Sequence, residues 1–146
     1  MKRILVCVDA SQRAPLVLTT AIDLARRLDA KLRLFRVVGL PPEIPSEFYS
    51  VSPNKIPEFL LEKAKNDLEE LSRDVPPELL DGLFTQIGSP WDAICSTAHV
   101  QDVDLVVLGS HGYGALDRVL GTTAAKVVNH IDRSVLIVRP KGAGPK

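Results

Sequence analysis

Apolar positions along the chain follow two patterns, short continuous runs and longer segments with helical spacing. Residues 4–8 are apolar without alternation, as is typical of a parallel strand covered on both faces. Residues 105–108 have the same character, whereas residues 31–38 alternate between apolar and polar side chains. Five strands are predicted, at residues 3–8, 31–38, 82–87, 105–108 and 134–138.

The segments between these runs carry apolar residues at the spacing of an amphipathic helix. The first helical face runs to Leu28, and Ser11 is predicted to cap that helix. In the last helix Val128 is predicted to face inward, with Thr122 or Thr123 as its cap. Four helices are predicted. The first extends from just after Ser11 to Leu28, and the second covers residues 58–73. The third begins at Pro90 with Ser89 as its cap, and the fourth covers residues 122–130.

Alternating strands and helices predict an α/β fold, a single-domain doubly wound parallel sheet with helices on both faces. We expect this domain to cover residues 1–140 and residues 141–146 to form a disordered tail. Residues 39–57 contain five prolines and no periodicity, which predicts a long loop. A lid, a partner-binding segment and a plain surface excursion are all open interpretations of this loop.

Composition limits the range of functions. Of 146 residues, 45% are hydrophobic, and 18 basic side chains balance 18 acidic ones. Such a balance does not attract nucleic acid or an anionic membrane. No apolar run approaches the roughly 20 residues of a membrane span, and no signal-peptide pattern is visible, so a cytoplasmic location is predicted. Cys7 and Cys95 form no C-x-x-C motif and are interpreted as small buried side chains.

A glycine-rich segment follows the fourth predicted strand. Gly109, Gly112 and Gly114 let backbone N–H groups face a ligand, and Gly121 stands at the start of the next helix. The beginning of a helix attracts anions, so the combination favours a phosphate. Neither the P-loop nor the dinucleotide fingerprint fits, because Gly121 is followed by two threonines and the third glycine of the fingerprint is replaced by Asp117.

The spacing Gly109-x-x-Gly112, eight residues, Gly121-Thr122 resembles the ATP-binding signature of the universal stress protein family. That family has nine residues where this chain has eight. The resemblance extends from residue 3 to residue 139. It implies the strand order 3-2-1-4-5, with the ligand at the switch point between strands one and four. It also implies ATP, with Mg²⁺ as an option, and a role in the stress response. The family's adenine contacts match Asp9 and the backbone of Val37, and its phosphate contacts match Gly109, Gly112, Gly121, Thr122 and Thr123.

Asp9 is the acidic candidate that the residues themselves indicate. It follows the first strand, where a carboxylate could accept a hydrogen bond from a ribose hydroxyl or an adenine edge. A turn or capping role is the alternative. The chain has no pairing of a nucleophile with a base, so no enzyme is predicted. Metal-assisted hydrolysis, with Asp9 and Thr122 beside Mg²⁺, would give at most a slow ATPase.

Two functional hypotheses follow. The first is a cytoplasmic ATP-binding universal-stress-type module whose nucleotide state biases a partner or its own assembly. The second is a dimeric interaction scaffold that holds no ATP because its glycine loop is one residue short. A homodimer is predicted in both cases, because the last strand is apolar and lies at the predicted sheet edge. Its contact residues would be Val135, Leu136, Ile137 and Val138.

Overall fold

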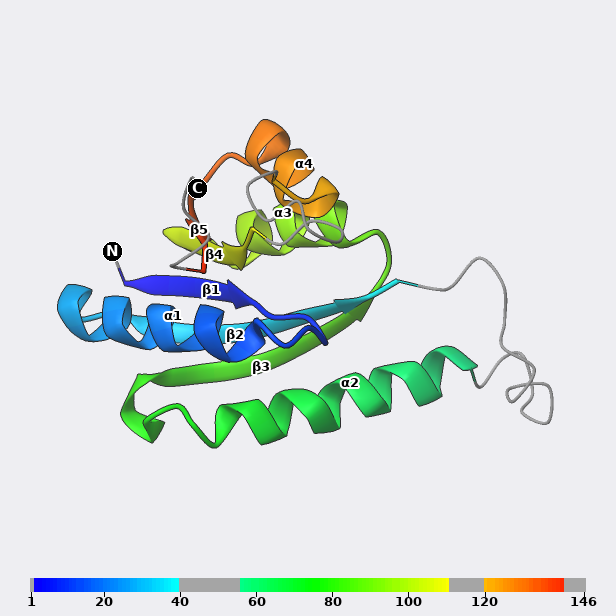
Figure 1. Cartoon of the computed structure of the whole chain (residues 1–146), viewed down its shortest axis with the longest axis horizontal. Helices are drawn as coiled ribbons and strands as arrows, with labels where there is room; N and C mark the ends of the chain where they lie inside the picture. Colours follow the sequence, from blue (N-terminus) through cyan, green and yellow to red (C-terminus); the bar gives the residue numbers. More distant parts are fainter. Residues whose placement is uncertain (1, 40–55, 111–119, 141–146) are drawn as a thin grey trace, which may run out of the picture.

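Strands and helices alternate along the chain in the computed structural model, which describes residues 2–39, 56–110 and 120–140 (Figure 1). The elements are, in order, β1 (Arg3–Cys7), α1 (Ala14–Leu28), β2 (Lys31–Val38), α2 (Ile56–Ser72), the 3₁₀ turn η3 (Pro77–Leu79), β3 (Leu80–Ile87), α3 (Pro90–Val100), β4 (Leu105–Gly109), α4 (Thr122–His130) and β5 (Ser134–Val138).

All five strands are parallel, and the sheet has the order β3-β2-β1-β4-β5. The predicted fold class and strand order are therefore confirmed. β1 lies at the centre, with Ile4 opposite both Leu32 and Leu105. The chain moves outward from β1 to β3 on one side, then returns to the other side through β4. This reversal creates a switch point between β1 and β4.

Helices cover both faces of the sheet, α1 and α2 on one side and α3 and α4 on the other (Figure 1). Successive residues of β1 divide between two cores, because side chains alternate along a strand. Ile4 and Val6 pack with α1 and α2, whereas Leu5 packs with α3 and α4. Both cores are apolar, which explains why the strands read as continuous apolar runs.

Two predicted core positions are wrong. Leu28 is 40% exposed and Val128 is 46% exposed. Leu28 is the last residue of α1, and on α4 the buried positions are Ala124 and Val127. Val128 is a further 100° around the helix from Val127, which turns it away from the sheet.

The capping of α1 and α3 differs from prediction. α1 begins at Ala14 with Arg13 as its N-cap, so Ser11 is not the cap. Instead, the Ser11 hydroxyl accepts a hydrogen bond from the backbone N–H of Arg13 at 3.2 Å, two residues along in the turn. Ser89 does occupy the N-cap position of α3, but its side chain makes no capping bond.

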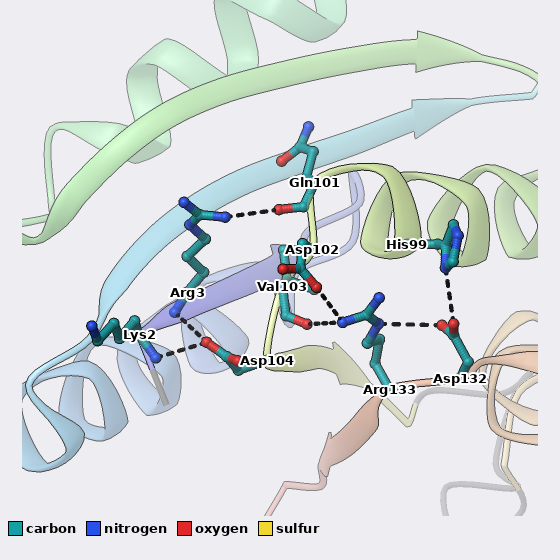
Figure 2. A network of polar contacts seen from close by, with 9 residues as sticks. All are labelled: Lys2, Arg3, His99, Gln101, Asp102, Val103, Asp104, Asp132 and Arg133. Carbon is teal, nitrogen blue, oxygen red and sulfur yellow. Dashed lines mark hydrogen bonds and ion pairs between the residues drawn. The ribbon is translucent and has the colours of Figure 1, made fainter.

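Polar contacts connect the elements at the end of the sheet where the strands begin, opposite the carboxyl ends of β1 and β4 (Figure 2). The carboxylate of Asp104 accepts hydrogen bonds from the backbone N–H groups of Lys2 and Arg3, at 2.7 and 3.0 Å. These two bonds hold the pKa of Asp104 below its usual range. They join the beginning of β1 to the residue that precedes β4, and so fix the register of the two central strands.

Candidate functional site

A pocket of about 250 Å³ lies at the carboxyl ends of β1 and β4, where the order of the sheet reverses. It brings together six of the seven residues proposed from the sequence. Gly112 lies outside the described residues. The pocket is lined by Cys7, Val8, Asp9, Phe35, Val37, Pro90, Ile94, Leu108, Gly109, Gly121, Thr122, Thr123 and Ala124.

Backbone hydrogen bonds bring the first and last glycines of the motif to the same pocket. The N–H of Ser110 donates to the carbonyl of Val138 at 3.1 Å, which continues the pairing of β4 with β5. The carbonyl of Ser110 in turn accepts from the N–H of Gly121 at 3.2 Å. Gly109 and Gly121 therefore both reach the pocket, although eleven residues separate them in sequence. Ser110 is 1% exposed, and its hydroxyl has no hydrogen-bond partner within the described residues.

The start of α4 forms the polar wall of the pocket. Gly121 is the N-cap, with φ −60° and ψ 158°, and no side chain caps the helix. The prediction that Thr122 or Thr123 caps it is wrong, because both threonines are already within the helix. Their exposed side chains line the pocket instead. The first turn of α4 contains no acidic residue, so its N–H groups and dipole are available to an anion.

Asp9 lies just beyond the end of β1 and lines the same pocket. One of its carboxylate oxygens accepts a hydrogen bond from the N–H of Ser11 at 2.9 Å. This local bond fixes the orientation of the carboxylate at the pocket. The turn role and the ligand role that the sequence left open as alternatives are therefore compatible.

The other wall of the pocket is apolar. Phe35 and Val37 come from β2, Ile94 from α3 and Leu108 from β4. Of these, the sequence reading singled out Val37 alone. Period-two alternation could have placed Phe35 on the same face as Val37, but only the path of α3 across the sheet brings Ile94 to the site.

Cys7 also lines the pocket. Cys7 and Cys95 both pack against the apolar core between the sheet and the helices α3 and α4. Both are of intermediate exposure, so their interpretation as small buried side chains holds only in part. Burial raises the pKa of the Cys7 thiol, and the nearby Cys95 raises it further. A neutral thiol is a poor nucleophile. The pocket is therefore suited to binding rather than to thiol chemistry.

The pocket has the oxygen groups that a magnesium–nucleotide complex would need. Within the described residues no cluster of three or more His, Cys, Asp or Glu side chains could hold a metal alone. Mg²⁺ is typically bound by one or two carboxylates together with substrate phosphates. The Asp9 carboxylate and the Thr122 hydroxyl fit that requirement, since both line the pocket.

The architecture is that of doubly wound α/β proteins, which bind ligands at the switch point of a parallel sheet. Residues 1–139 match the Universal stress protein family, and the chain belongs to it. A putative universal stress protein of Staphylococcus aureus (strain USA300) is 29% identical over 140 residues, which cover 94% of this chain and 84% of that protein.

Solved structures agree with this assignment. The hypothetical protein MJ0577 superposes with a TM-score of 0.78 at 26% identity, covering 97% of each chain. The universal stress protein UspA from Lactobacillus plantarum superposes with a TM-score of 0.69 at 26% identity, covering 94% of this chain and 97% of its own.

Two less similar structures contain nucleotides. One is a universal stress protein in complex with cAMP, at 22% identity and a TM-score of 0.64 over 94% of this chain and 96% of that one. The other is the universal stress protein from Archaeoglobus fulgidus in complex with dAMP, at 19% identity and a TM-score of 0.57 over 95% and 98%. At these identities the likeness establishes the shared fold alone. In this chain, no helix of the described ranges is long and apolar enough to cross a membrane.

Proposed function

We propose that this chain is a cytoplasmic regulatory module that binds an adenine nucleotide, with ATP as its ligand. The observation that carries the proposal is the convergence of Asp9, Gly109 and the uncapped start of α4 on one pocket at the switch point. An apolar wall and an amide-rich wall suit the two ends of a nucleotide. The cAMP and dAMP complexes of related proteins support the same class of ligand.

In this proposal each wall holds one part of the ligand. The adenine lies between Phe35, Val37 and Ile94, where apolar side chains exclude water. Asp9 accepts a hydrogen bond from the ribose or from the base. The phosphates lie against Gly109 and the first turn of α4, where backbone N–H groups favour an anion. The site holds the nucleotide without reacting with it. Its occupancy biases the binding of a protein partner or the protein's own assembly.

Nucleotide binding can be tested with the purified protein. Adenine nucleotide that co-purifies is extracted and identified, and Mg-ATP is then titrated into wild type and Gly121→Val by calorimetry. We expect the variant to lose at least about tenfold in affinity, because the valine side chain fills the place where the phosphates approach. Gly39→Val is the matched control, since among the described residues a Cβ at Gly39 would meet a carbonyl oxygen at 3.9 Å, an ordinary contact.

The outcomes separate the two hypotheses stated above. Binding to wild type and to Gly39→Val, with loss in Gly121→Val, supports the nucleotide module. Failure of wild type to bind any adenine nucleotide supports the scaffold, whose shortened glycine loop does not hold a polyphosphate. Equal binding by all three proteins places the site elsewhere.

We also propose that two copies of the chain pair through β5. This strand is at the edge of the sheet, and its residues Val135, Leu136 and Ile137 are partly exposed. An apolar edge strand is an aggregation hazard unless something covers it. A second copy covers it by two-fold symmetry, and this assembly is compatible with either functional hypothesis.

A further inference from the structure

The hydroxyl group of Ser110 is buried without a hydrogen-bond partner in the part of the chain that the structure describes. Among the described residues, Ser110 is also the only buried one with a polar side chain. Buried hydroxyl groups are nearly always hydrogen-bonded, because an unmet bond leaves the cost of removing the group from water uncompensated. An exception beside a pocket points to a partner that comes from outside the chain.

The position of Ser110 puts its hydroxyl at the start of α4. Its N–H continues the ladder of β4 with β5, and side chains alternate along a strand, so Ser110 faces the same side of the sheet as Leu108. Leu108 lines the pocket and packs in the core under α3 and α4. The carbonyl of Ser110 accepts a hydrogen bond from the N–H of Gly121, the N-cap of α4. The Ser110 hydroxyl therefore lies on the α4 side of the sheet, next to the first turn of that helix.

The groups at this end of the pocket call for a ligand that accepts hydrogen bonds. The N–H groups in the first turn of α4 can only donate, and neither a capping side chain nor an acidic residue serves them within the described residues. A serine hydroxyl can donate as well. A negatively charged oxygen accepts from both kinds of donor, and such bonds are roughly twice as strong as those between neutral groups. A phosphate supplies several oxygens of this kind.

We propose that the Ser110 hydroxyl is a phosphate-binding group of this pocket, unpartnered in the free protein and completed by a phosphate oxygen of the bound nucleotide. This inference rests on the proposed function. Ser110 lies directly behind Gly109 and Gly121, which line the pocket, and rotation of its side chain between staggered positions turns the hydroxyl toward the ligand. The unmet bond lowers the stability of the free protein, and its completion raises the affinity for phosphate.

This trade between stability and affinity gives the test its sign. Ser110→Ala removes the hydroxyl with little change in volume. After dialysis to remove co-purified nucleotide, we expect the Tm of Ser110→Ala to lie roughly 3 °C above that of wild type, because a buried unpartnered group has been removed. Calorimetry should show that its affinity for Mg-ATP is about tenfold weaker. A variant that is more stable than wild type has not lost affinity through misfolding.

A second serine and a second ligand provide the controls. The hydroxyl of Ser72, at the end of α2, already donates to the carbonyl of Glu69 at 2.6 Å. Ser72→Ala should therefore show no comparable rise in Tm and no change in Mg-ATP affinity. Adenosine has no phosphate, so in competition with Mg-ATP it should bind wild type and Ser110→Ala equally.

Each alternative result has a separate meaning. A Tm of Ser110→Ala below that of wild type would show that the hydroxyl supports the fold, and the proposal would be wrong. A higher Tm with unchanged Mg-ATP affinity would also overturn it, while nucleotide binding itself would stand. An equal loss of affinity for adenosine and Mg-ATP would assign the effect to the adenosine end of the pocket. If wild type binds no adenine nucleotide, the proposed function fails, and this inference fails with it.

Discussion

Aspartates end two helices in a conformation that is usually left to glycine. Asp29 has φ 53° and Asp102 has φ 50°, both in the left-handed region. In each case the next N–H bonds back into the helix, from Ala30 to Ala25 at 2.9 Å and from Val103 to Ala98 at 3.1 Å. This is the hydrogen bond of a Schellman ending, in which glycine avoids the steric cost of a Cβ.

Substitution by glycine is expected to change the stability of the protein differently at Asp29 and at Asp102. Asp29→Gly should stabilise the protein by about 1 kcal/mol, because it relieves the left-handed strain. Asp102→Gly relieves the same strain but removes the carboxylate that accepts from Arg133 at 2.6 Å, so its net effect should be close to zero (Figure 2). Thermal unfolding followed by circular dichroism measures both. Asp29→Gly being no more stable than Asp102→Gly would contradict this account.

At the scale of elements, one carboxylate joins the beginnings of the two central strands. The folded pKa of Asp104 lies below its ordinary value of about 3.9, chiefly because the N–H groups of Lys2 and Arg3 donate to it. A lowered acid pKa contributes stability that is fully present above the unfolded pKa. That contribution is lost as the pH falls through the folded pKa.

Asp104→Asn should therefore lower the Tm at pH 7, by up to about 3 °C because the group is solvent-exposed. The gap from wild type should close as the pH falls below about 4. Asp23→Asn is the control, since Asp23 pairs only along its own exposed helix face with Arg27. The control should show little difference from wild type at either pH. A gap for Asp104→Asn that persists in acid would show that the loss does not come from the charge.

The boundaries of the helices and strands show where local sequence signals were sufficient to predict the limits of an element. β2, α4 and β5 have the predicted limits, because each is bounded by polar or turn residues in a clear pattern. α2 begins two residues before the predicted start, and β3 begins at Leu80, two residues before the predicted Gly82. Pairing of Leu32 with Leu80 extends β3 backward, which is a long-range effect that local spacing does not report.

For the whole molecule, the free edge of β5 leads to a prediction about assembly. The carbonyl of Val138 accepts a hydrogen bond from the N–H of Ser110, the residue that follows β4. Alternation along the strand therefore turns the N–H of Ile137 away from β4 and toward the open edge. Ile137→Pro removes that outward donor while leaving the bonds to β4. Wild type should sediment as a dimer at micromolar concentration and Ile137→Pro as a monomer. Ile137→Val keeps the N–H and should remain a dimer.

A monomeric wild type at that concentration would overturn the pairing through β5. A second informative result is dimerisation by both variants, which would place the interface on another face of the molecule. Circular dichroism of Ile137→Pro distinguishes loss of pairing from loss of fold.

The sequence alone determined the α/β class and the family resemblance, because periodicity and glycine spacing are local properties. It also pointed to Asp9, Gly109 and Gly121, since each stands at the end or beginning of a predicted element. Only the tertiary structure decided which residues complete the pocket. Phe35 and Ile94 reach the pocket because β2 lies beside β1 and α3 packs on the same face of the sheet. Residue spacing along the sequence does not report such contacts between distant elements.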